Sequence, residues 1–239
     1  DRLVWQLFAI LVTIIRAWEA QEQEWTPVNV GMVFFGAMAA YTGLRSHLFI
    51  ATVANMLRTW RQMPEVWDNY WWDLQTDVSL LACFLLDLSL EDYSSIVKRQ
   101  YLLFYSAAAF WKFNSAFADP TASCATIFTL QHLAFFGGEA LAKSLASTVA
   151  PLAPSATLLL ESLVGLGMFC KPKAGAFFAF VLHGLISATP RPNNISSFSA
   201  KCAPKLLLFA DLDVLAAIYK KRRLLFTLVF LPAYLAFIA

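Results

Sequence analysis

The stretch 101–117, YLLFYSAAAFWKFNSAF, is almost wholly apolar and contains a single charged residue, Lys112. A segment this hydrophobic is expected in a protein core or in lipid. An ammonium group within a bilayer costs roughly 2.5–3.5 kcal/mol on insertion scales, so it normally faces a cavity or a partner. Two interpretations of Lys112 are open. It marks a functional site, or it lies near a helix end and extends its amine to the membrane surface.

The composition of the whole chain indicates a membrane protein. Apolar residues make up 59% of the 239 residues, and the mean hydropathy is +0.59. The 18 basic and 16 acidic residues provide too little polar surface to cover a soluble globule of this size. The apolar residues come in blocks without the alternation of barrel strands, so helices are expected. We therefore predict an all-α, polytopic transmembrane bundle of about seven to nine helices, in one membrane domain covering residues 1–239.

The apolar blocks set the expected helices. They lie at about 3–18, 28–41, 74–90, 101–117, 125–148, 156–170, 174–188, 205–219 and 224–239. Several are shorter than the roughly 20 residues that cross a bilayer, so some are expected to be tilted or to span it only in part. Most basic residues stand at block ends and form no stripe interleaved with aromatics, so no nucleic-acid partner is expected. The expected partners are membrane lipids and other membrane protein subunits.

Two segments between the blocks have a distinct composition. Segment 56–75 carries four tryptophans among arginines and acids, which is typical of an amphipathic helix and turn at the membrane interface. A ligand-stacking role for Trp71 or Trp72 is the alternative. Segment 187–204 contains Pro190, Pro192 and the Asn193-Asn194 pair, which favour a turn. We expect an ordered loop there that packs against helix ends or caps a cavity.

More polar residues fall inside the apolar blocks than a lipid-facing bundle requires: Asp87, His132, Glu139, Glu161 and His183. Glu161 and His183 flank a Lys-Pro-Lys turn at similar distances, so they are expected at similar depth on two neighbouring helices. A structural hydrogen bond between them is one interpretation. A catalytic acid/base pair acting with Lys112, or axial ligands to a metal-centred pigment, are the alternatives.

A cofactor site is a further hypothesis. Gln131 and His132 precede a Gly-Gly pair, and glycines allow a large ring to approach the backbone, although small residues also serve close helix packing. The candidate cofactor-binding residues are Gln131, His132, Glu139, Glu161, His183, Trp71 and Trp72. Chlorophyll, carotenoid, a quinone or bound lipids are the expected ligands. The cysteines lack the spacing of a zinc site, so no protein metal site is predicted.

Three motifs carry a family resemblance. They are YSAAAFWKFNSAF at 105–117, LESLVGLGMFCKPKAGAFFAFVLHGLIS at 160–187 and, more loosely, WDLQTD at 72–77. In order and spacing they resemble the horizontally transferred transmembrane (HTTM) domain, a fold shared with vitamin K-dependent gamma-carboxylases. The second motif is similar to that family's helix pair, with Glu161 in the first helix and His183 in the second.

The resemblance implies a role for Lys112. This residue matches the lysine of the carboxylases thought to be the base that starts vitamin K hydroquinone oxidation. Desolvation lowers the pKa of a buried lysine, so such an amine can be neutral and act as a base in a quinone-sized pocket. The carboxylases also carry a large extramembrane portion that helps bind their substrate, and only the membrane half has a counterpart here. Gamma-glutamyl carboxylation is therefore not expected.

Two classes of function follow. The first is an integral membrane accessory subunit of a larger complex, which contributes helix packing and binds pigment, lipid or quinone. By analogy with pigment-rich assemblies, a photosystem in the thylakoid is the expected setting. The alternative is a small HTTM-type membrane enzyme in which Lys112 is the base for chemistry on a quinone or lipid, with Glu161 and His183 as further catalytic candidates.

Overall fold

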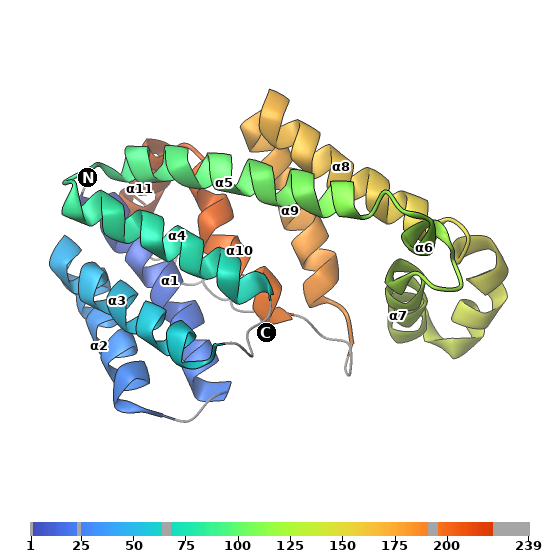
Figure 1. Cartoon of the computed structure of the whole chain (residues 1–239), viewed down its shortest axis with the longest axis horizontal. Helices are drawn as coiled ribbons and strands as arrows, with labels where there is room; N and C mark the ends of the chain where they lie inside the picture. The colour runs from blue at the N-terminus through green and yellow to red at the C-terminus, as the bar shows by residue number, and fades with distance from the viewer. Residues whose placement is uncertain (1, 23–24, 64–67, 191–195, 222–239) are drawn as a thin grey trace. The chain divides into compact units, whose positions relative to one another are not determined.

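The computed structural model describes residues 2–22, 25–63, 68–190 and 196–221, and within these ranges the chain forms helices and no strand (Figure 1). The prediction of an all-α fold is confirmed. The chain divides into two compact units. Among the described residues, the first unit comprises those within 2–98 and 200–221, and the second comprises those within 99–199. The single membrane domain over residues 1–239 stays a prediction, because this division by packing does not test it.

The first unit contains α1 (Arg2–Glu22), α2 (Pro27–Thr42), α3 (Arg45–Arg61), α4 (Asp68–Leu85), the start of α5 (Leu90–Trp111), most of α10 (Ser196–Leu206), the 3₁₀ helix η1 (Leu207–Phe209) and α11 (Leu212–Lys221). α2 packs against α1 and α3. It begins where the Thr26 hydroxyl accepts the Asn29 N–H at 3.3 Å, and it ends at Gly43, whose φ of 66° closes the helix.

The second unit contains the rest of α5, α6 (Ser115–Ala118), α7 (Cys124–Val149), α8 (Ala153–Cys170), α9 (Pro172–Ser187) and the start of α10. α8 and α9 form a tight hairpin because Gly167 and Gly175 meet backbone to backbone. A Cβ atom added to Gly175 would lie 2.1 Å from the Met168 nitrogen. α7 is interrupted at Gly138, where φ is 82° and ψ is 161°. These helices surround the candidate site described below.

Within the part of the chain that the structure describes, two helices have the length and hydropathy to cross a membrane, namely residues 2–20 of α1 and residues 153–170 of α8. α2 and α9 are apolar but shorter. Large apolar side chains also lie on the surface, and among the most exposed are Tyr41 at 83% and Trp111 at 76%. Water disfavours a surface of this kind, whereas lipid or a partner protein would cover it.

Three predicted segments differ from the structure. α4 ends at Leu85, so Asp87 stands in a turn with a φ of 53° and an exposed carboxylate, and its predicted burial is wrong. α5 ends at Trp111, so Lys112 lies in a turn and not within a helix. Residues 196–206 form α10, so the predicted loop 187–204 is shorter than expected. In the first two cases the chain turns inside an apolar block, and in the third a helix begins inside the predicted loop.

Other segments lie partly or wholly outside the described residues. The Trp-rich segment 56–75 comprises the end of α3 and the start of α4, and residues 64–67 between them are not described. The last apolar block, 224–239, also lies outside the described residues. α3 as a whole was not among the predicted blocks, because its arginines and asparagine lower its hydropathy.

Candidate functional site

The second unit contains a cavity of about 450 Å³. Its walls are mainly apolar and include Phe117, Phe128, Leu160, Leu182 and Phe198. Three charged or titratable residues from the predicted set also line it: Lys112, His132 and Glu161. A volume of this size is within the roughly 300–1,000 Å³ of small-molecule sites, which are likewise apolar with a few polar groups. The cavity is therefore the candidate functional site.

The turn after α5 positions Lys112. The Asn114 side chain donates to the Trp111 carbonyl at 2.7 Å and accepts the Phe117 N–H at 2.9 Å, which stops α5 and starts α6. The Lys112 ammonium then lies 2.7 Å from Glu161 on α8 and 5.8 Å from the centre of the Phe117 ring. An ammonium carries three N–H donors, more than the one Glu161 oxygen in contact with it can accept, so N–H groups are left for a ligand.

The ion pair bears on the hypothesis that Lys112 is a base. Glu161 is buried, whereas Lys112 is half-buried at the cavity. In this arrangement Lys112 is the cation of an ion pair, and it could act as a base only after separation from Glu161. Chemistry at Lys112 therefore needs a ligand that breaks the pair.

His132 joins two helices at the cavity. Its Nδ1 lies 2.7 Å from the carbonyl oxygen of Phe128 in α7, and its Nε2 lies 2.8 Å from the carbonyl oxygen of Leu185 in α9. Both ring nitrogens are thus engaged by the backbone, and neither is available to a pigment metal. The preceding residue, Gln131, is half-buried and does not line the cavity.

His183 is completely buried and belongs to a separate cluster. Its Nε2 accepts a hydrogen bond from the Tyr105 hydroxyl, and its Nδ1 lies 3.2 Å from the Ser199 hydroxyl. Ser199 donates its own proton to the His183 carbonyl, so it accepts from Nδ1–H, and this fixes the tautomer. The predicted bond between His183 and Glu161 is wrong, because equal depth on a hairpin does not fix the direction around each helix.

The remaining predicted residues lie away from the cavity. Glu139 is exposed and pairs with Lys143 at 3.7 Å on the surface of α7, so its predicted burial is wrong. It directly follows Gly138, where α7 is interrupted. Trp71 is exposed and Trp72 is half-buried, and both belong to α4 in the first unit. The structure thus brings together Lys112, His132 and Glu161, and not the rest of the predicted set.

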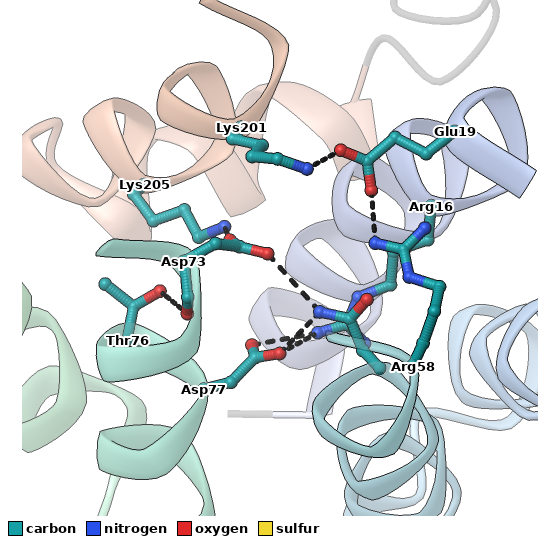
Figure 2. A network of polar contacts seen from close by, with 9 residues as sticks. Arg16, Glu19, Arg58, Asp73, Thr76, Asp77, Lys201 and Lys205 are labelled. Carbon is teal, nitrogen blue, oxygen red and sulfur yellow. Dashed lines mark hydrogen bonds and ion pairs between the residues drawn. The ribbon is translucent and has the colours of Figure 1, made fainter. Parts of the chain in front are cut away.

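Sequence reasoning missed a buried ionic network in the first unit (Figure 2). Its members are Arg16 and Glu19 of α1, Asn55 and Arg58 of α3, Asp73 and Asp77 of α4, and Lys201 and Lys205 of α10. Arg16 Nη2 contacts both oxygens of Asp77 at 2.9 and 3.1 Å, and Arg58 Nη2 lies 2.6 Å from Glu19. Lys201 pairs with Glu19, and Lys205 with Asp73. The network thereby ties α10 to three other helices.

The network has no room for a ligand. The adjoining cavity is only about 10 Å³, which is about the space of one water molecule. By residue type the network holds four cations and three anions. Burial lowers the pKa of the Lys201 amine well below its usual value. We assign the network a structural role. Its signal in the sequence is pairs of polar residues three or four positions apart on each of four helices.

The chain matches no family model, no curated protein and no solved structure.

Proposed function

We propose that this is a membrane protein whose second unit binds a small apolar molecule, with the polar head of that molecule held by Lys112 and Glu161. The observation that carries the proposal is the apolar cavity of about 450 Å³, with an ion pair of 2.7 Å in its lining. An ion pair in an apolar wall is costly unless a partner uses it, and a ligand with one polar end would gain both contacts.

The proposal includes a place in a larger membrane complex. The surface exposes large apolar side chains, such as Trp60 at 70% and Phe169 at 74%, which suit lipid or a neighbouring subunit. An HTTM-like polytopic bundle and a photosynthetic setting remain parts of this proposal. Because the ring nitrogens of His132 and His183 are engaged, a lipid- or quinone-sized ligand is favoured over a pigment.

A second candidate function is catalysis with Lys112 as the base. The position of Lys112 in the lining of a cavity supports it. In this version the ligand separates the pair, the ammonium proton of Lys112 passes to Glu161, and the neutral amine then takes a proton from the ligand. Recovery of a chemically altered ligand would favour the enzyme over the binding protein.

The test is binding of decanol by the full chain in lipid nanodiscs, followed by native mass spectrometry. Thr157 of α8 lines the cavity, so Thr157→Trp should fill part of it and abolish binding. Leu159→Trp is the matched control, because Leu159 lies on the same helix, is 61% exposed and does not line the cavity. The proposal fails if wild type binds no decanol, or if both variants bind it equally well.

A further inference from the structure

The hydrogen bonds of His132 define its charge. Its two ring nitrogens lie 2.7 and 2.8 Å from backbone carbonyl oxygens, those of Phe128 and Leu185. A carbonyl oxygen can only accept a hydrogen bond, so each contact needs an N–H on the ring. A neutral imidazole has one N–H and an imidazolium has two. The geometry therefore matches the cationic ring, which adds a positive charge to the lining of the cavity.

Among the residues that the structure describes, the other groups that face the cavity leave this charge without a counterion. Lys112 and Glu161 form a pair that is neutral as a whole. From α7 the only other titratable lining group is the Cys124 thiol. The lining residues of α6, α9 and α10 are uncharged. The cavity thus carries one net positive charge between apolar walls, where a charge interacts more strongly than in water.

We propose that the cavity binds an anionic amphiphile, a molecule with one negatively charged head and an apolar tail. This inference rests on the proposed function and names the class of its ligand. The head accepts from the Lys112 N–H groups that Glu161 leaves free, and it neutralises the charge of His132. The tail packs against Phe128 and Leu182. A carboxylate, a sulfonate and the phosphate of a single-chain lipid share this chemistry.

The test compares two probes with the same tail, decanesulfonate and decanol, on the full chain in nanodiscs of neutral lipid. The sulfonate keeps its charge at any pH, so the two probes share the tail and differ in the charge of the head. At pH 6 decanesulfonate should bind at least about tenfold more tightly than decanol. Equal binding of the two probes, or tighter binding of decanol, would overturn the proposal.

Two variants separate the histidine from the ion pair. His132→Gln removes the cation, so its preference for decanesulfonate should be weak. The double variant Lys112→Met/Glu161→Gln removes two opposite charges and leaves the net charge unchanged. Its affinity for both probes should fall, but the preference for decanesulfonate should remain. An unchanged preference in His132→Gln would assign it to another residue and contradict the inference. The wild-type comparison of the two probes decides the matter even if a variant does not fold.

The outcomes distinguish this inference from the proposed function. Binding of decanol without a preference for the anion would keep the cavity as a site and refute the anionic ligand. Binding of neither probe would refute both. If phosphatidylglycerol in the nanodisc competes with decanesulfonate, the anionic ligand is a membrane lipid. If it does not compete, the ligand is a free amphiphile. Either result retains the anionic head.

Discussion

Replacement of Asp77 by leucine should strongly destabilise the first unit. The Asp77 carboxylate accepts from Arg16 at 2.9 and 3.1 Å and from Asn55 at 2.7 Å, and its side chain is only 2% exposed. Asp77→Leu would leave the Arg16 guanidinium, 5% exposed, without its counterion. Loss of one partner of a buried ion pair costs about 3–5 kcal/mol. At about 2–4 °C per kcal/mol for a chain of this size, Tm should fall by about 6–20 °C.

The assay is thermal unfolding in detergent, followed by tryptophan fluorescence. Asp87→Asn is the matched control. The Asp87 carboxylate also pairs with an arginine, Arg45 at 2.9 Å, but it is 94% exposed, and asparagine tolerates its φ of 53°. An exposed pair contributes about 0–1 kcal/mol, so this change should be small. The double variant Asp77→Leu/Arg16→Met should recover much of the loss, because no charge is then left unpaired. Equal effects of Asp77→Leu and Asp87→Asn would refute the reasoning.

Two further variants, Gly175→Ala and Tyr105→Phe, probe the second unit, and Gly31→Ala in α2 of the first unit is the control for Gly175→Ala. Gly175→Ala should lower the free energy of unfolding by about 1–3 kcal/mol or more, because its Cβ would lie 2.1 Å from the Met168 nitrogen. Gly31→Ala, whose Cβ would have no atom within 4 Å, should raise it by about 0.5–1 kcal/mol. Chemical unfolding checks both variants, and a tolerated Gly175→Ala would contradict the close hairpin. Tyr105→Phe should lower the free energy of unfolding by about 1–3 kcal/mol, because it leaves the buried His183 Nε2 unpaired. Decanol binding should not change, since neither residue lines the cavity. A loss of binding at unchanged stability would show that the pair acts on the site.

The helices could largely be predicted from hydropathy, but their ends could not. The block 101–117 is continuously apolar, yet α5 stops at Trp111 because Asn114 satisfies backbone groups on both sides of the turn. Such a cap depends on one side chain, and one side chain hardly changes the average hydropathy of the block. α3 shows the opposite case. Its buried Asn55 and Arg58 made it look polar, although its neighbours cover both residues.

The candidate site was predicted in part. Lys112, Glu161 and His132 each stood out as polar residues in apolar surroundings, and all three line one cavity. Their pairing could not be predicted, because it depends on the direction each side chain takes around its helix. The sequence spacing predicts that Glu161 and His183 lie at the same depth on two neighbouring helices and could therefore bond. The structure pairs Glu161 instead with Lys112, which lies in the turn after α5. Hydropathy also could not separate a buried polar residue from an exposed one, as Glu139 shows.

The two polar clusters differ in the property that decides function, the space beside them. The ionic network has more charged groups, but its members contact one another and about 10 Å³ is left for anything else. The cavity has fewer charged groups, but about 450 Å³ adjoins them. A buried charge whose partners all belong to the protein stabilises one arrangement of helices. A buried charge beside an open volume can interact with a molecule that enters it. For this reason the ligand experiments belong at Lys112 and His132, and the stability experiments belong at Asp77.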